Sequence, residues 1–322
     1  MTLIDPLVMA VLLPPELRMK KYFLFLCSLV TLACSDEKPQ GATWKQLNDF
    51  PFEGRGFGLS FSLLGKGYLV SGPQPSNSDL TDVWSYDPNA DSWTRKKDYP
   101  FSFVLESAVT TNDRAYIIDY TGRLYEYNPT TDSWKFLSEF PTGYRTGLTG
   151  FGLGGDVYFG TGNGVSQGSG YFNDFWKYDV SENEWTRIED FPGMARSTAI
   201  SFVIGDNAYV GLGSSAGAPP IHTDVYRYNA GTGKWFQIAD LPTDDYLVGL
   251  SFSNDSKGYI GLAERDYAKM YEYDPSTDSW KETTTFQSEY CVLTNSFTVN
   301  NRMFVFGGRA MTYGQHVWEF LP

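Results

Sequence analysis

Three arginines recur at one place in repeating sequence units, eleven residues after a tryptophan: Arg55, Arg145 and Arg196. A guanidinium group is planar and always charged, and it forms paired hydrogen bonds with a carboxylate. If these positions begin the innermost strands of a repeated fold, the arginines surround one opening, with Tyr246 at an equivalent place and Glu106 facing the same way. The pattern predicts a pocket for an anionic ligand, such as an acidic sugar, or for an acidic loop of a partner protein. The alternative is that the arginines brace neighbouring loops.

Residues that commonly bind metals are scarce. The chain has two histidines, His222 and His316, and Cys291 is the one cysteine outside the N-terminal segment. A metal site built from two imidazoles and a thiol would need further ligands, and no matching pair of tyrosine and histidine lies in these loops. We expect no metal site and no cofactor. The sequence also lacks a phosphate-binding loop and the His-Glu-x-x-His and Cys-x-x-Cys motifs.

The spacing of six tryptophans reveals the elements that must position these residues. They are Trp44, Trp93, Trp134, Trp185, Trp235 and Trp280. A proline stands seven residues after each of the first five, with a large apolar residue directly before it. Nine residues before every tryptophan except the first stands another aromatic residue, and a tyrosine follows two places later. This alternation has the period of a strand, and turns rich in Asp, Pro and Asn predict a hairpin before each tryptophan.

A short apolar strand with an aromatic first residue lies upstream in each unit. Examples are the segments that start at Tyr68 and Phe304. A further strand is expected between the preceding proline and this segment, so that each unit contains four strands. Because the units repeat at intervals of 41–51 residues, the sequence predicts an all-β fold built from six similar units.

The pattern resembles the Kelch repeat, which is marked by a glycine pair after the second strand and by spaced tyrosine and tryptophan residues. The resemblance covers residues 43–322. The full glycine pair is present at Gly307 and Gly308, whereas other units split or replace it, as at Gly160 and Gly162. The resemblance implies a six-bladed β-propeller with four strands per blade.

The two ends of the chain predict how such a propeller closes. The last unit has Trp318, but the chain reaches Pro322 before the tryptophan of a fourth strand. Trp44 stands ahead of the first complete unit and can supply that strand. We therefore expect residues 44–49 to pair with the strand around Trp318, which removes the sheet edges that an open array would expose.

Two enzymes with propellers of the Kelch type show a distant resemblance to this chain. The central domain of galactose oxidase implies a copper site, whose histidines and tyrosines have no counterpart here. The N-acetylneuraminate epimerase implies a sugar epimerase or mutarotase, in which an acid and a base move a proton at the anomeric centre. Glu106, Glu264 or Glu289 would take these roles, and the arginines would bind the sugar carboxylate. This resemblance lies in architecture and residue type.

Composition and charge agree with the expected fold and exclude one class of partner. Of the 322 residues, 42% are hydrophobic and 17% aromatic, and 32 glycines and 17 prolines suit many short strands and turns. The formal net charge is −13. Because this field repels a phosphate backbone, we exclude nucleic acid as a partner.

The N-terminal segment indicates export. A basic start at Lys20 and Lys21 is followed by an apolar stretch over residues 22–33, which is too short to span a bilayer and suits a secretory signal. We expect residues 19–33 to be a signal peptide and residues 1–18 to be a wrongly assigned start, with Met19 the true one.

Cys34 follows Ala33 as the lipidated cysteine does in bacterial lipoproteins, and the acidic residues after it resemble an export signal of surface lipoproteins in the Bacteroidetes. We expect residues 34–42 to be a lipid anchor and linker and residues 43–322 to form the propeller. The expected location is the outer membrane, and the acidic tract favours exposure on its surface. Cleavage by the ordinary signal peptidase, which would give a periplasmic protein, is the alternative.

These patterns favour a binding module without catalysis, exposed on the bacterial envelope, whose ligand is an extracellular protein or a glycan. The membrane is contacted only through the lipid anchor. A carbohydrate epimerase is the second interpretation.

Overall fold

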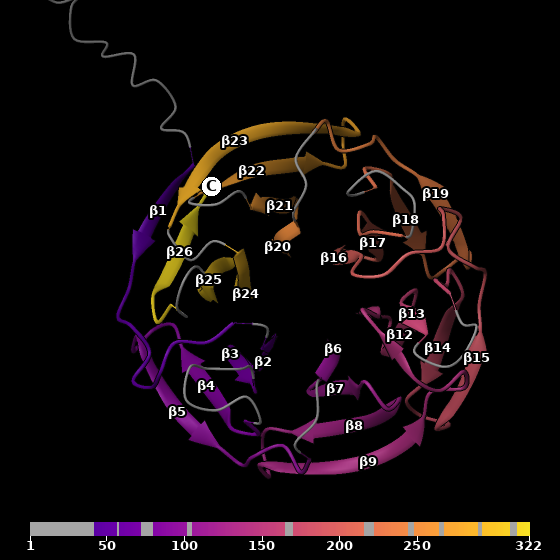
Figure 1. Ribbon diagram of the computed structural model, residues 1–322, viewed down its shortest axis with the longest axis horizontal. Helices are drawn as coiled ribbons and strands as arrows, with labels where there is room; N and C mark the ends of the chain where they lie inside the picture. Colours follow the sequence, from indigo (N-terminus) through magenta and orange to yellow (C-terminus); the bar gives the residue numbers. More distant parts are fainter. Residues whose placement is uncertain are drawn as a thin grey trace, which may run out of the picture. The chain divides into compact units, whose positions relative to one another are not determined.

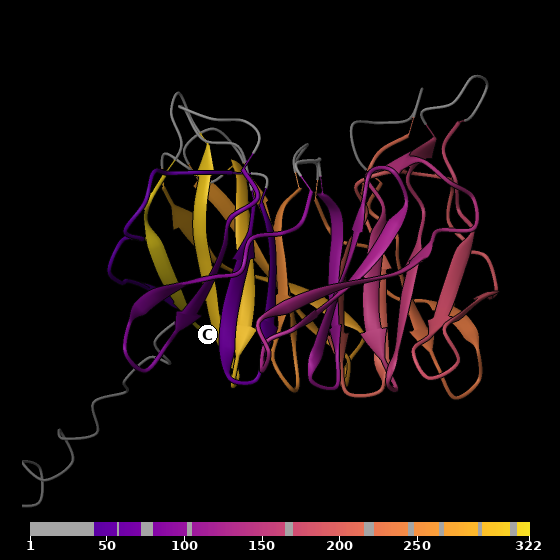
Figure 2. The same ribbon diagram turned by 90° about the horizontal axis from the view of Figure 1, so that it is seen from below.

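The computed structural model describes residues 42–56, 58–71, 80–101, 105–164, 170–215, 222–243, 248–263, 267–288, 292–309 and 314–322. Within these residues every regular element is a β-strand, and six antiparallel sheets of four strands surround a common axis (Figure 1). From the side, the inner strands run along that axis (Figure 2). The predicted all-β, six-bladed propeller is confirmed. In the described residues no helix is long and apolar enough to cross a membrane.

The first three blades follow one another along the chain. Blade 1 contains β2 (Leu59–Leu63), β3 (Lys66–Val70), β4 (Val83–Asp87) and β5 (Ser92–Lys96). Blade 2 contains β6 (Leu105–Thr111), β7 (Arg114–Asp119), β8 (Arg123–Asn128) and β9 (Ser133–Glu139). Blade 3 contains β11 (Thr149–Leu153), β12 (Asp156–Gly160), β14 (Phe175–Asp179) and β15 (Glu184–Arg187). A separate short pair in the same repeat joins β10 (Arg145–Thr146) to β13 (Asn163–Gly164).

The remaining blades repeat this order. Blade 4 contains β16 (Ile200–Ile204), β17 (Asn207–Gly211), β18 (Val225–Asn229) and β19 (Lys234–Gln237). Blade 5 contains β20 (Val248–Ser253), β21 (Gly258–Ala263), β22 (Tyr267–Asp274) and β23 (Ser279–Gln287). Blade 6 contains β24 (Val292–Val299), β25 (Arg302–Arg309) and β26 (Val317–Leu321), and its outer strand is β1 (Thr43–Gln46). The first strand of each blade lies nearest the axis (Figure 1).

The outer strand of blade 6 comes from the opposite end of the chain. β1 pairs antiparallel with β26, with Trp44 opposite Phe320 and Gln46 opposite Trp318. The Trp44 ring lies 4.4 Å from the ring of Phe286 in blade 5 and 4.9 Å from that of Phe320. The predicted closure by the N-terminal strand is therefore confirmed, and it joins blade 6 into the ring.

Aspartates in the outer hairpins join adjacent blades. The hydroxyl of Tyr86 donates a hydrogen bond to Asp91, which has a left-handed φ of 45°, as this tight turn requires. The backbone N–H of Asn48, which follows β1, also donates to Asp91, at 3.1 Å. In the same way Lys97 N–H, after the outer strand of blade 1, donates to Asp132 in blade 2. The turn residues predicted from the Asp-rich segments thus connect one blade to the next.

The hydrophobic core lies between the blades. One cluster combines Leu69 and Tyr86 of blade 1 with Phe297 and Phe304 of blade 6. Another combines Phe252 and other residues of blade 5 with blade 6, and Trp44 packs against it. Because each apolar face is buried only by its neighbour, the blades support one another around the ring and hold the innermost strands in fixed places.

Candidate functional site

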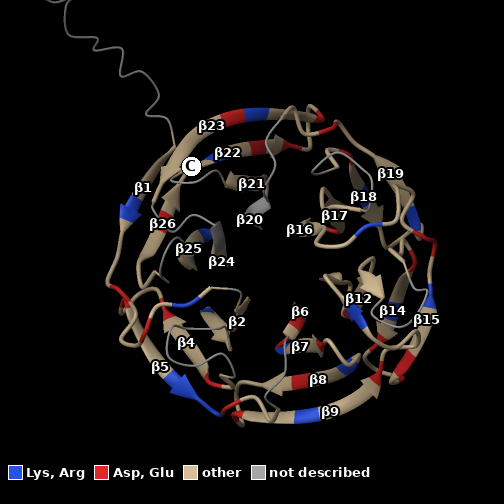
Figure 3. Cartoon of the chain, in the orientation of Figure 1, with Lys and Arg blue, Asp and Glu red and all other residues tan. Residues whose placement is uncertain are grey.

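A channel along the axis is lined by the six innermost strands. At the end where these strands begin, the channel widens into a cavity of about 390 Å³ that residues of all six blades line. A second cavity of about 270 Å³ lies deeper and is lined by the middle of the same strands. Glu106 in β6 is the one charged residue among the sequences of the six innermost strands, and most other charges lie on outer strands and turns (Figure 3).

The end of the channel where the innermost strands begin, which we call the channel mouth, is most polar on one side, while the other side combines apolar with polar side chains. Thr294 of blade 6, Gly58 of blade 1 and Glu106 of blade 2 line it on three adjacent blades. Leu148 and Ala199 line it on blades 3 and 4. An asymmetric ligand would therefore have one preferred orientation in this opening.

Glu106 reaches the channel mouth because β6 contains a bulge. Leu105 pairs with Asp119 and Ser107 pairs with Ile118, so Glu106 is the extra residue between them. Its carboxylate accepts a hydrogen bond of 2.6 Å from the backbone N–H of Gly147 in blade 3. Burial raises the pKa of Glu106 to about 7, with a smaller contribution from the charge of Asp119 and in spite of the hydrogen bond. The carboxyl group can hence gain or lose a proton near neutral pH.

Two polar side chains in blade 6 lack partners at this opening. The amide nitrogen of Asn295 and the hydroxyl of Thr294 are buried and make no hydrogen bond to the described residues. Asn295 is only 4% exposed, and both residues line the channel mouth. A buried donor without a partner costs free energy, which a ligand or a water molecule in the cavity would recover if the side chain turned toward it.

Below the mouth, serine hydroxyls connect neighbouring blades. Ser296 donates to the carbonyl of Ser251, Ser251 to that of Ser201, and Ser60 to that of Ser296. Ser201 continues the series to Gly150. Gly150 has no hydroxyl and the equivalent position in blade 2 is Ala108, so the series stops at blade 3. The hydroxyls donate to carbonyls of the neighbouring blades, and that of Ser60 also accepts from the backbone N–H of Ser296.

The structure corrects the predicted position of the three arginines. The innermost strands begin at Leu59, Thr149 and Ile200, each four residues beyond its arginine. Arg55, Arg145 and Arg196 are 1%, 1% and 0% exposed, and none of them lines the channel mouth. Their guanidinium groups form ion pairs of 2.7, 2.5 and 2.6 Å with Asp82, Asp174 and Asp224 of the same blade. The arrangement is that of the alternative interpretation, in which the arginines brace loops, and it gives no support to the predicted anionic pocket.

Each arginine also supports a strained residue at the end of the second strand. Arg145 donates to the carbonyl of Thr161 and Arg196 to that of Leu212, both at 3.0 Å. Thr161 and Leu212 have left-handed φ values of 56°, and Ser71, the acceptor for Arg55, has 59°. A left-handed conformation costs a non-glycine residue about 1 kcal/mol. Blade 6 has Gly307 in the same place, with a φ of 68°, and the sequence there has Cys291 at the position of the arginine.

The distribution of the aspartates confirms this structural role. Each of the three lies eleven residues before the repeat tryptophan of its blade, and the indole N–H groups of Trp84 and Trp176 donate to two of them. In the three blades without the arginine the chain has Arg123, Lys269 and His316 at the aspartate position. Arginine and aspartate therefore occur together or not at all, as expected for partners in a buried ion pair.

Several predicted residues lie outside the described part of the chain. They are Tyr246, Glu264, Glu289, Cys291 and Cys34. Their predicted roles stay predictions. These include the roles of Glu264 and Glu289 as a second carboxylate that acts together with Glu106. In the described residues no group of three or more His, Cys, Asp or Glu side chains could hold a metal ion.

The two histidines make separate contacts. His316 lies 2.8 Å from Asp49 near the closing strand. His222 lies 2.9 Å from the hydroxyl of Ser215, and burial together with the charge of Arg196 lowers its pKa. A nucleophile also needs an oriented base and an oxyanion site, and in the described residues no carboxylate hydrogen-bonds to His222.

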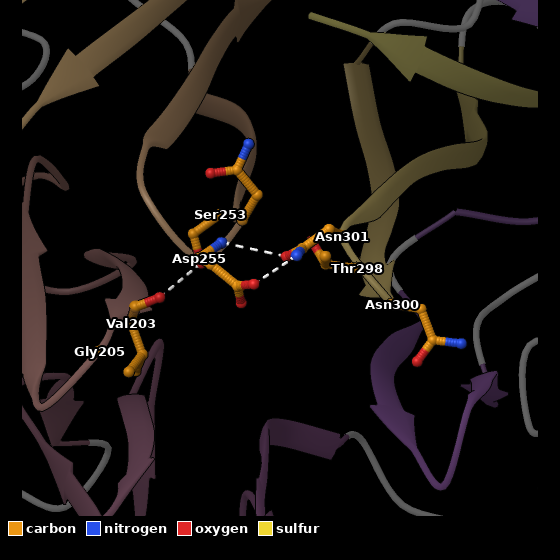
Figure 4. Close-up of a pocket in the computed structure, with 8 residues that line it drawn as sticks. Val203, Gly205, Ser253, Asp255, Thr298, Asn300 and Asn301 are labelled. Atoms are coloured by element: carbon orange, nitrogen blue, oxygen red, sulfur yellow. Dashed lines mark hydrogen bonds between the residues drawn. The ribbon is translucent and has the colours of Figure 1, made fainter.

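The opposite end of the channel has a second polar cavity, of about 380 Å³, at the inner hairpin tips of blades 4, 5 and 6 (Figure 4). Asp255 and Asn301 bond reciprocally there, with the backbone N–H of Asp255 donating to the Asn301 amide oxygen at 3.1 Å. Ser253 donates to the carbonyl of Val203 at 2.7 Å. These contacts join the hairpin tips of the three blades, and the buried hydroxyl of Thr298, which also lines this cavity, has no hydrogen-bond partner in the described residues.

Sequence reasoning identified Glu106 but missed Thr294, Asn295, Leu148 and Ala199. The signal for three of them was available, because Leu148, Ala199 and Thr294 each stand fourteen residues after a repeat tryptophan. No comparable signal marks Asn295, whose role follows from burial without a partner.

The arginine pairs give a prediction about stability. Replacing Arg145 by alanine leaves Asp174 buried without its counter-ion, so we expect the free energy of unfolding to fall by about 3–5 kcal/mol. Arg187 of the same blade pairs with Asp190 but is exposed, and Arg187→Ala should cost less than about 1 kcal/mol. Urea unfolding of both variants measures the difference. Similar losses in the two variants would contradict the buried role.

Glu106 gives a prediction about pH. Its folded pKa of about 7 lies above the ordinary value of 4.5, so the folded protein binds the extra proton between these values and loses stability as pH rises through this window. Glu106→Gln should therefore be more stable than the parent at pH 8, by on the order of 2 kcal/mol, and equally stable near pH 4. Urea unfolding at both pH values tests this, with Glu282→Gln on the exposed strand β23 as the control. A constant difference at both pH values would show that Glu106 titrates normally.

Comparisons with known proteins agree with this architecture. No protein-family model matches the chain. Kelch-like protein 21 of Rattus norvegicus is 40% identical over 62 residues, which are 19% of this chain and 10% of that protein. Kelch-like protein 21 of Danio rerio is 37% identical over 84 residues, 26% of this chain and 13% of that protein. The chain thus matches only about a tenth of the length of these curated relatives.

A solved structure extends the likeness to most of the chain. The structure of YjhT superimposes with a TM-score of 0.65 and 17% sequence identity, and the match covers 85% of this chain and 96% of that one. At this identity the likeness concerns the fold. With the six repeated sheets, it shows that this chain folds as a six-bladed β-propeller, part of which is similar in sequence to Kelch-like proteins.

Proposed function

We propose that the propeller is a glycan-binding module of the bacterial envelope, and that one unit of the glycan enters the channel mouth. The observation that carries this proposal is the cavity of about 390 Å³, which lies within the usual range for ligand pockets and is lined by hydroxyl, amide and carboxyl groups on a rigid ring. The export signal and Cys34 in the sequence support a location outside the cytoplasm.

The fold supports a binding role for a physical reason. Six blades present side chains to one opening, and each is held by the core between blades, so the polar groups need little reorganisation when a ligand binds. A binding partner that is a protein would have to insert a side chain into the same opening. Binding to the outer loops would leave the channel mouth without a role.

A substitution that fills the channel mouth tests the proposal. Ala199→Trp should abolish binding to glycans on an array, or weaken it at least tenfold, because the indole occupies the cavity. Ala90→Trp makes the same change in an exposed outer turn and should bind as the parent does. Circular dichroism and thermal unfolding establish that both variants fold. Glycan binding that survives in Ala199→Trp would refute the channel mouth as the site.

A sugar epimerase is the second candidate, and Glu106 is the observation that favours it. A carboxyl group with a pKa of about 7 can act as a general acid or base at neutral pH. The buried arginine pairs give no support to the cation that an acidic sugar would require. Unchanged exchange between the anomers of N-acetylneuraminate in the presence of the protein, followed by NMR, would exclude this candidate.

A further inference from the structure

The charge and polarity of the channel mouth limit what kind of sugar it can accept. This inference rests on the proposed function and concerns the same site. The spacing of three arginines in the sequence predicts an acidic ligand, because it places them around the opening. The structure places each of these arginines in an ion pair with its own aspartate, at 0–1% exposure.

Without the arginines, the described residues that line the mouth include one ionisable group, Glu106. An acidic sugar would bring a second carboxylate close to it. Near a protein surface, two like charges about 4 Å apart repel each other by several times the thermal energy. The formal charge of −13 on the whole chain adds to this repulsion.

The polar side of the mouth offers both hydrogen-bond donors and acceptors. The Asn295 amide nitrogen is a donor without a partner, and the Thr294 hydroxyl can donate and accept. Glu106 accepts when ionised. Gly58 beside them is required by packing, since a Cβ there would lie 2.6 Å from Leu69 and 3.3 Å from the Asn295 side chain. Sugar hydroxyls, which also donate and accept, complement this set.

The other side of the mouth is suited to the carbon skeleton of the sugar. Leu148 and Ala199 have apolar side chains and line the cavity there, next to the hydroxyl-bearing residues Thr149 and Ser201. A pyranose ring has a polar edge of hydroxyls and a less polar face of C–H groups. Its edge can bond to blades 6 and 2 while its face packs against blades 3 and 4.

We propose that the channel mouth binds an uncharged, hydroxyl-bearing sugar unit and discriminates against the corresponding acidic sugar. Glu106 is the group that discriminates, and Thr294 together with Asn295 orients the sugar edge. The site therefore selects neutral glycans from mixtures that also contain uronic acids.

Matched pairs of methyl glycosides test this assignment. The probes are the methyl glycosides of galactose, glucose and mannose, and those of the three uronic acids, in which a carboxylate replaces the terminal CH₂OH group. Dissociation constants are measured at pH 8 by NMR titration of residues 42–322. At least one neutral glycoside should bind at least tenfold more tightly than its acidic counterpart. Glu106→Gln should reduce this ratio below about threefold, and Thr294→Val should weaken the neutral glycoside about fivefold.

The outcomes separate this inference from the proposed function. An acidic member that binds as tightly as its neutral counterpart, or a ratio that Glu106→Gln leaves unchanged, would overturn the inference. So would the failure of all six sugars to bind. In each of these cases the proposed function still stands if Ala199→Trp removes glycan binding on the array, and it fails if that variant binds normally.

Discussion

The pairing of β1 with β26 is the interaction on which the rest of the structure depends. Four residues from the start of the propeller add the outer strand of its last blade, and Trp44 enters the core between blades 5 and 6. Without this strand, β26 would be left as an unpaired edge of blade 6. Closure also fixes the distance across the channel, because the innermost strands keep their places only while every blade has two neighbours.

The polarity of the channel mouth and the pKa of Glu106 depend on that closed ring. Thr294 belongs to the last blade and Glu106 to the second, so the polar side of the opening spans the junction where the chain closes. A bulge in β6 turns Glu106 toward the opening, and burial by neighbouring blades moves its pKa toward neutrality. Similar blades thus produce an asymmetric site, because positions at which the repeats carry different residues lie next to one another around the axis.

The fold was accessible from the sequence because aromatic residues in a propeller must recur at fixed positions. Tyrosine and tryptophan pack between blades, and their spacing gave the six units, the four strands of each and the closing strand. The predicted position of the arginines was wrong because their ion-pair partners are close in space but distant in the sequence. Counting from each tryptophan gave the approach to the innermost strand, but the partners of Arg145 and Arg196 lie 29 and 28 residues further along the chain. The environment of Glu106 and the lack of a partner for Asn295 depend on other blades, which no local pattern encodes.

Amide hydrogen exchange of residues 42–322 tests the central claim that closure by β1 holds the ring together. The N–H of Leu47, directly after β1, donates a hydrogen bond of 2.9 Å to the carbonyl of Val317. If closure and folding are one cooperative event, this amide exchanges as slowly as those in β25, with the free energy of global unfolding. Exchange at Leu47 that is faster by orders of magnitude, while the innermost strands stay protected, would show that the ring persists without its closing strand.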